Sequence, residues 1–185
     1  MKRCLVYAIG LAVLALLLSG CGQSREEQRR EEFSQALSRR GELRFTASLR
    51  AEYPDRSLAY TLRYTEDESG CSLRLLEPEE LDGLTVRLGA DGTQLKLDGL
   101  SLDAPPLDGR GLSPVSALPR LVDLLRHGHL ESHWSERGQT VWELSDGEGL
   151  RAQVWLDEAL KPARAELISE GRVTVFCTIT DWNQG

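Results

Sequence analysis

The sequence lacks the features that mark most enzymes and nucleic-acid-binding proteins. It contains no Walker loop and no GxGxxG segment, and the run from Ser69 to Ser72 has no histidine placed to serve as a catalytic base. Basic residues are outnumbered by acidic ones, 22 to 29, and the net charge of −7 argues against nucleic acid and against anionic lipid headgroups as the main partner. No period of roughly 20–50 residues repeats, which excludes a solenoid. We therefore predict that the protein is not an enzyme.

Histidine is also scarce, which limits metal chemistry. The three histidines, His127, His129 and His133, fall close together, and a zinc site needs two or more ligands on one face. If this segment is a strand, residues four apart lie about 13 Å from each other, too far to share one metal ion. We interpret these side chains as a polar outward face, and we predict no metal site and no cofactor.

The longest apolar run is N-terminal. It extends from Leu5 to Leu18, which is short for a membrane-spanning helix of about 20 residues, and a small-residue pattern with a cysteine follows it. Leu18, Ser19, Gly20 and Cys21 resemble the lipobox of bacterial lipoproteins. The resemblance implies that residues 1–20 are a signal peptide and that Cys21 becomes a palmitate-bearing diacylglyceryl cysteine. A retained transmembrane anchor is the alternative.

This resemblance implies a location. The mature protein is expected to be lipid-anchored on the extracytoplasmic face of the cell membrane, or on the outer membrane if the cell has one. Residues 21–32 would then form the lipidated N-terminus and a charged tether, and residues 33–185 a single domain.

The segment after Cys21 has a helical pattern. Ser24 and Glu27 have the spacing of a capping box, and Gly41 is placed to end the helix in the left-handed conformation. Its apolar residues at helical spacing all lie in the second half: Phe33, Ala36 and Leu37. We expect the second half to dock on the domain and the first half to be a solvated spacer. A partner-binding helix is the alternative.

From residue 43 onward the apolar period changes to two, which predicts strands. Strands are expected near 43–53, 58–65, 71–75, 84–88 and 93–97, and after a break near 130–137, 139–144, 150–156, 163–169 and 173–179. Within the break, the pattern predicts a helical turn at 114–118 and a main helix at 119–127, divided because Pro119 has no N–H to donate. The helix has a broad apolar side, so we predict an α+β, mostly β fold in which it packs on an antiparallel sheet.

The C-terminal part is similar to the ending of lipoproteins of the LolA/LolB/LppX-like superfamily. The matching positions are Val154, Leu156, Asp157, Pro162, Glu166, Gly171, Val173, Val175 and Trp182. The resemblance covers this ending and otherwise only the layout of the elements. It implies a strongly curved antiparallel sheet, an unclosed half-barrel, with a helix on its concave face. Many members hold acyl chains there, although a shared fold does not transfer a function.

Two functions stay open at this stage. The first is a non-enzymatic envelope lipoprotein that binds an apolar ligand, a lipid or an acyl chain, in the curved sheet. The residues expected on that ligand face are Phe45, Leu49, Tyr60, Leu62, Tyr64, Leu121 and Leu125. The second is a protein–protein interaction module of the envelope with a filled core and no ligand. A continuous apolar cavity would distinguish the two.

Two cysteines remain in the expected domain. Cys71 and Cys177 both share a strand face with apolar neighbours, in a compartment that permits disulfides. They could form a bridge, which requires Cα atoms within about 7 Å, or remain buried free thiols.

Overall fold

The computed structural model describes residues 25–39, 41–53, 55–89, 92–104 and 113–185. Residues Phe33–Gly185 form a compact unit that contains the whole hydrophobic core, and the chain up to Glu32 falls in a separate unit. The predicted lipobox and lipidation site therefore lie outside the described residues. Among the described residues, no helix is both long and apolar enough to cross a membrane.

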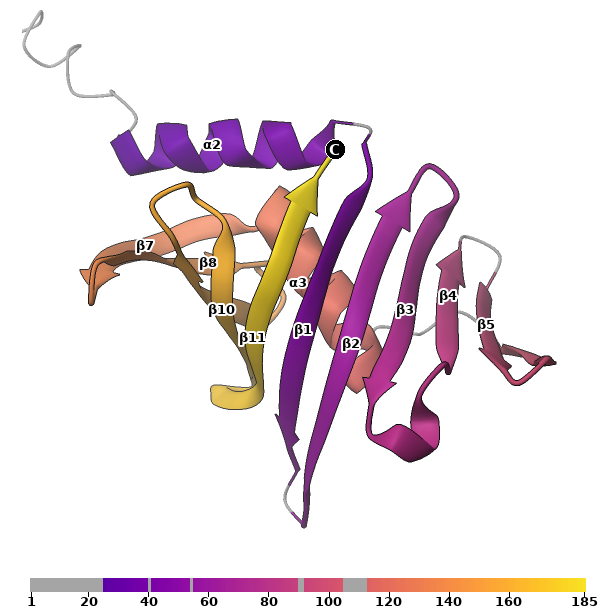
Figure 1. The fold of residues 1–185 in the computed structure, drawn as a ribbon. Coiled ribbons are helices and arrows are strands. Elements are labelled where there is room, and N and C mark those ends of the chain that lie inside the picture. Colours follow the sequence, from indigo (N-terminus) through magenta and orange to yellow (C-terminus); the bar gives the residue numbers. More distant parts are fainter. Residues whose placement is uncertain (1–24, 40, 54, 90–91, 105–112) are drawn as a thin grey trace, which may run out of the picture. The chain divides into compact units, whose positions relative to one another are not determined.

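The chain contains two α-helices and eleven strands in its described parts (Figure 1). In chain order these are α2 (Arg25–Ser38), β1 (Leu43–Glu52), β2 (Ser57–Asp67), β3 (Gly70–Glu77), the short 3₁₀-helix η1 (Glu79–Leu81), β4 (Thr85–Gly89), β5 (Gly92–Leu97), β6 (Leu100–Ala104), α3 (Pro114–His127), β7 (His129–Glu136), β8 (Gln139–Ser145), β9 (Leu150–Leu156), β10 (Pro162–Ser169) and β11 (Arg172–Gln184).

All eleven strands form one antiparallel sheet in the order β6-β5-β4-β3-β2-β1-β11-β10-β9-β8-β7. Each half is a meander in which neighbouring strands are consecutive in sequence, and the pairing of β1 with β11 joins the halves. The terminal strands β6 and β7 do not pair with each other, so the sheet is curved but not closed. This confirms the predicted unclosed, mostly β architecture.

The alternation in the strands has the predicted consequence for packing. In β1, every second residue from Leu43 to Ala51 is at most 3% exposed, while Arg44, Ser48 and Arg50 face solvent. Most buried strand residues belong to one cluster with the apolar side of α3. Val141, Trp155 and Ile168 are also buried, but they lie on the opposite face of β8–β10, outside this cluster. The core therefore lies between the sheet and this helix.

Helix α3 begins as the sequence predicts. Ser113 is its N-cap and exchanges side-chain and backbone hydrogen bonds with Ser116, and Pro114 occupies the first turn, where its missing N–H is not needed. Gly128 follows the last turn, and a Cβ there would come within 2.6 Å of the Leu124 carbonyl oxygen. Only glycine fits this close approach.

The prediction of two helical pieces divided at Pro119 was wrong, because α3 is continuous from Pro114 to His127. Pro119 cannot donate to the carbonyl of residue 115, but it lies early in the helix, where only one bond is lost. Fully buried leucines on both sides, Leu118 and Leu121, anchor the helix to the sheet. Burial of each is worth about 1.5–3 kcal/mol, enough to offset the loss.

Two other local predictions were also wrong. A break in the strand pattern was expected after the strand near 93–97, but β6 (Leu100–Ala104) pairs with β5 as the edge of the sheet. Gly41 does not have the left-handed conformation expected of it, and α2 ends at Ser38. Gly41 instead provides space, since a Cβ there would lie 2.5 Å from the carbonyl oxygen of Gly185.

The second half of α2 docks on the sheet's core, as expected from its apolar residues. Leu37 is 2% exposed, and the Phe33 ring meets the Trp142 ring edge-on, with centroids 5.6 Å apart. Ser24, the expected N-cap, lies outside the described residues.

The role of α3 in the core generates a stability prediction. Leu121→Ala removes a side chain with no exposed surface and should lower the free energy of unfolding by about 2–5 kcal/mol, measured by urea denaturation. Leu102→Ala is the matched control, since Leu102 is 64% exposed and its loss should change stability by less than about 0.5 kcal/mol. Equal effects of the two substitutions would contradict this description of the core.

Candidate functional site

The structure brings the predicted ligand-face residues together in one place. Phe45 and Leu49 on β1, three residues of β2, and two leucines of α3 belong to the same core cluster. Six of the seven have 0–3% of their surface exposed, and Tyr60 is partly buried: Phe45, Leu49, Leu62, Tyr64, Leu121, Leu125 and Tyr60. All seven therefore lie in, or pack against, one buried cluster of the sheet and helix.

Aromatic stacking fills the centre of this cluster. The Phe45 ring stacks on Tyr64, with centroids 4.7 Å apart, and on Trp182, with centroids 4.9 Å apart. Trp182 belongs to the extension of β11 beyond the predicted strand end, so its part in the core could not be assigned from periodicity. The ring planes lie 16° and 23° from parallel, the arrangement of a tightly filled interior.

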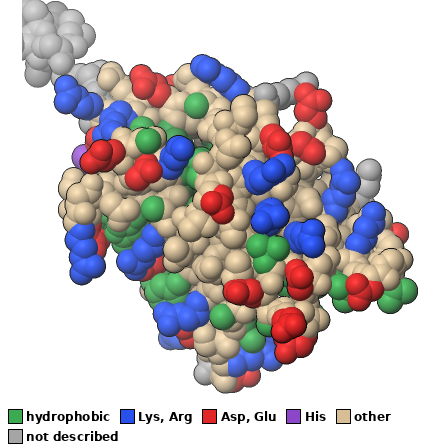
Figure 2. All heavy atoms as spheres, in the orientation of Figure 1, with side chains coloured by type: hydrophobic (Ala, Val, Ile, Leu, Met, Phe, Trp, Pro, Cys, Tyr) green, Lys and Arg blue, Asp and Glu red, His purple; other side chains and the backbone are tan. Residues whose placement is uncertain are grey.

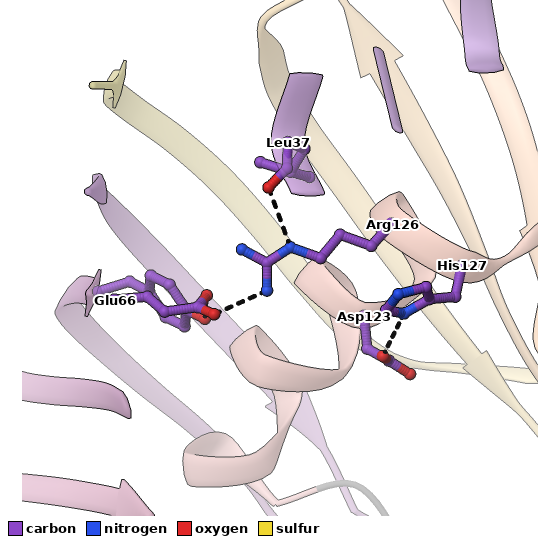
Figure 3. Close-up of polar contacts among 6 residues, drawn as sticks. Leu37, Glu66, Asp123, Arg126 and His127 are labelled. Atoms are coloured by element: carbon purple, nitrogen blue, oxygen red, sulfur yellow. Dashed lines mark hydrogen bonds and ion pairs between the residues drawn. The ribbon is translucent and has the colours of Figure 1, made fainter. Parts of the chain in front are cut away.

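One end of the core is closed by polar contacts around Arg126, near the C-terminus of α3 (Figure 3). Its guanidinium Nη1 lies 2.7 Å from Oε1 of Glu66 on β2, and its Nε donates to the carbonyl oxygen of Leu37 on α2, at 3.2 Å. Glu66 also accepts a hydrogen bond of 2.6 Å from the Tyr64 hydroxyl, and the Ser34 hydroxyl donates to the Arg126 carbonyl oxygen. Arg126 thus connects both helices to the sheet.

Beside these contacts lies an open, polar hollow. It has a volume of about 490 Å³ and is lined by Leu37, Glu66, Asp67, Arg126 and His127, among others. A second hollow, near Arg87 and Gln94, is also polar. Neither contains any of the seven residues expected to hold an apolar ligand.

Sequence reasoning did not identify Arg126 or Glu66 as partners. Both are charged residues near the ends of their elements, and such residues are ordinarily solvated. The one available signal is that Glu66 falls in phase with Tyr64 and Leu62, on the face that the alternation assigns to the core. A carboxylate in that phase needs a partner when it is buried.

The cysteines are free thiols. Cys71 lies on β3 and Cys177 on β11, and strands β2 and β1 separate them in the sheet. Neighbouring strands are about 4.8 Å apart, so the two Cα atoms are separated by about 14 Å along the sheet, beyond the reach of a disulfide. Burial raises the pKa of both thiols to about 12, and neither is suited to act as a nucleophile.

The histidines do not converge. His127 Nδ1 lies 2.9 Å from an oxygen of Asp123, one turn earlier on α3, and His129 and His133 are exposed on β7. In the described ranges, no group of three or more histidine, cysteine, aspartate or glutamate side chains is arranged to hold a metal ion.

Comparisons with known proteins identify the fold. No protein-family model matches the chain, and no curated protein does. An uncharacterized conserved protein from Thermus thermophilus aligns with a TM-score of 0.51 and 13% identity, over 87% of this chain and 88% of that one. A LolA superfamily protein from Nitrosomonas europaea has a TM-score of 0.45 and 11% identity, over 84% and 92% of the two chains.

Lipoprotein LppX from Mycobacterium tuberculosis has a TM-score of 0.42 and 13% identity, over 85% of this chain and 93% of that one. At such low identity, the Thermus likeness supports a common fold and no common function. The fold is a single open antiparallel sheet with a helix in its concavity, and such a fold does not determine a function.

The polar contacts generate a second prediction. Arg126→Gln removes the charge that faces Glu66, and because both side chains are only about one-fifth exposed, at 21% and 23%, stability should fall by about 1–3 kcal/mol. Glu66→Gln and the double variant complete a double-mutant cycle, measured by urea denaturation. The double variant should lose less stability than the sum of the two single losses. Arg44→Gln, whose ion pair with Glu42 is exposed, is the control and should have little effect. Strict additivity would show that the two groups do not interact.

The raised pKa values generate a third prediction. Burial raises the pKa of Cys71 and Cys177 from 9.0 to about 12, and burial also raises the pKa of Tyr64. Above pH 9 the unfolded chain loses these protons while the folded chain keeps them, so stability is complete below about pH 9 and is lost between about pH 9 and 12. Urea midpoints across this range should fall with pH, and less steeply for Cys177→Ala. A midpoint that stays constant up to pH 12 would contradict the burial of these groups.

Proposed function

We propose that this chain is a non-enzymatic lipoprotein of the cell envelope whose domain binds another protein and holds no lipid in its core. The observation that carries the proposal is the burial of the face expected to hold an apolar ligand. The location rests on the resemblance of Leu18, Ser19, Gly20 and Cys21 to a lipobox, with Cys21 as the anchor on the extracytoplasmic side.

The filled core argues against a carrier in this state. An acyl chain on the concave face would have to take the place of α3, whose apolar side includes the buried residues Leu118, Leu121, Val122, Leu124 and Leu125. At about 2 kcal/mol each, their exposure would cost about 10 kcal/mol, comparable with the whole stability of a domain. The ligand would cover the apolar face of the sheet again, but the apolar side of α3 would stay exposed to water.

The two edges of the sheet differ, and the difference indicates where a partner strand could pair. The β7 edge carries exposed His129, Glu131 and His133 and has an irregular register after Leu130, features that discourage pairing. The β6 edge has regular register and two exposed leucines, Leu100 at 77% and Leu102 at 64%. Among the described residues, β6 has only β5 as a neighbour, and an edge of this kind suits the addition of a strand from another protein.

A lipid-binding function is the second candidate, and one observation favours it. The apolar row across the concave face passes from Phe45 through Tyr64, Leu73 and Val86 to Leu95, and its register partner on β6 is the exposed Leu102. Apolar surface therefore continues past the covered part of the face. An acyl chain could lie there if α3 moved.

Native mass spectrometry distinguishes the two functions, and this is the fourth prediction. Residues 22–185, which include the whole core, would be produced in a periplasm, purified without detergent and weighed intact, and the solvent extract would be analysed for lipid. We expect the mass of the protein alone and no binding of a fluorescent fatty acid. A stoichiometric co-purified lipid would overturn the proposal and establish the carrier function.

Site-specific crosslinking of the same protein would locate the partner. A photo-crosslinking residue at position 102 on β6 should give one discrete adduct in cells, and a crosslinker at position 131 on β7 is the matched control on the opposite edge. Leu100→Lys, which places a charge on the β6 edge, should abolish the adduct. The midpoint temperature of thermal unfolding of the domain should not change. Equal adducts from both edges would contradict partner binding at β6.

A further inference from the structure

The outer face of the sheet, opposite the core, contains a row of residues without a carboxylate. The row crosses seven neighbouring strands, and the side chains stand directly opposite one another in the register. From β11 to β6 its members are Thr180, Thr46, Arg63, Arg74, Thr85, Lys96 and Ser101. Three cations and four hydroxyl groups are thus collected on one face of a chain whose net charge is −7.

The adjacent row adds a fourth exposed cation, Arg87 on β4, which lies two residues from Thr85. We call Arg63, Arg74, Arg87 and Lys96 the basic patch. Figure 2 views this side of the sheet and shows blue side chains gathered over β2–β5. Since strands are about 4.8 Å apart, the four cations span about 15 Å.

The basic patch differs in its ion pairing from several arginines elsewhere in the described domain. Arg44, Arg50, Arg126, Arg151 and Arg164 each lie within 4 Å of a glutamate carboxylate. In the parts of the chain that the structure describes, none of the four patch residues forms such an ion pair; Arg87 donates to the Ser69 hydroxyl, at 2.7 Å.

The carboxylates of this face lie around the patch and already accept hydrogen bonds. Glu77 accepts from Thr61, Asp67 from Ser69, and Asp103 from Gln94. They keep their negative charge: hydrogen bonds from Ser69, with a smaller contribution from the charge of Arg87, lower the pKa of Asp67. In the described parts of the chain, none of the three lies within ion-pair distance of a patch residue.

The arrangement also has a cost within the sheet. Arg63 and Arg74 are direct cross-strand neighbours, whose Cβ atoms lie about 5 Å apart, and like charges in such pairs repel each other. A bound anion would relieve this repulsion. Guanidinium groups pair with phosphate oxygens through two parallel hydrogen bonds, and the flanking threonine hydroxyls can donate to the same oxygens.

We propose that the basic patch docks the domain on the phosphate groups of an anionic lipid bilayer. The patch is a broad sheet face and no enclosed pocket, which suits an extended charged surface better than a single small ion. A lipid anchor on Cys21 would hold the domain beside a bilayer, which makes the bilayer the nearest large anionic surface. On this point the inference rests on the proposed function. About a dozen residues separate Cys21 from Phe33, and even fully extended they reach only about 40 Å.

The docking would fix which side of the domain faces the lipid. With the outer face of β2–β5 on the bilayer, the exposed leucines of β6 point away from that surface, because they belong to the concave face. The membrane would then use the outer face of the sheet, and a protein partner would use the β6 edge and the leucines on its concave side.

Vesicle sedimentation with residues 22–185, which carry no lipid anchor, tests the docking separately from the anchor. The protein should bind vesicles of equal parts phosphatidylcholine and phosphatidylglycerol, and not phosphatidylcholine alone, with an affinity that falls steeply as salt is raised. Combined Arg63→Gln, Arg74→Gln and Lys96→Gln should weaken binding on the order of a hundredfold, about fivefold for each charge. The midpoint temperature of thermal unfolding of this triple variant should be unchanged or higher, because the cross-strand repulsion is removed.

The matched control carries Arg50→Gln, Arg151→Gln and Arg164→Gln, which change the net charge equally at arginines that already face glutamates. It should bind like the unaltered protein. Equal losses in the two triple variants, or no preference for the anionic vesicles, would overturn the proposal. Binding of inorganic phosphate or polyglutamate without binding to vesicles would assign the patch to a free anion or an acidic protein and overturn it too.

Discussion

The burial of the apolar side of α3 against the concave face of the sheet is the interaction on which the rest of the structure depends. An open sheet of eleven strands has a large apolar face and cannot cover it by closing on itself. One helix of 14 residues, with the second half of α2 beside it, covers the middle of that face. The stack of Phe45, Tyr64 and Trp182 beneath shows how completely the space is used.

The helix fixes the chemistry of the remaining surfaces. It leaves apolar surface at the β6 end of the concave face, polar contacts around Arg126 at one end of the core, and an outer face whose exposed side chains over β2–β5 include the basic patch. The features that remain to explain a function are an edge, a basic patch and an expected lipid anchor, all of which suit binding.

Much of the fold follows from the sequence because the strands are half-buried. Leu43 to Ala51 alternate so clearly that face, strand and fold class can be assigned without a structure, and the start of α3 at residue 114 was also predicted. The errors occurred where local and tertiary effects compete. Pro119 was expected to divide α3, but the burial of its neighbours outweighs one missing hydrogen bond. β6 was missed because its leucines are exposed and an edge strand needs only one neighbour.

The site was less predictable than the fold. The residues expected on an apolar ligand face lie in or against one buried cluster, but periodicity cannot tell a lined cavity from a filled core. The pairing of Arg126 with Glu66 joins positions 60 residues apart and leaves no local signal. The basic patch was hidden for a related reason: the net charge of −7 argued against anionic lipids, and only the strand register reveals that Arg63, Arg74 and Lys96 share one row.

The central claim, that α3 is a permanent part of the core, is tested most directly by native-state hydrogen exchange of its backbone amides. If the claim is right, the amides of residues 121–125 exchange only through global unfolding, with the same free energy and denaturant dependence as those of β1 and β2. Exchange of α3 through a smaller opening that leaves β1 and β2 protected would contradict it. Such an opening would mean that the helix leaves the concave face while the sheet stays folded, as a lipid carrier would require.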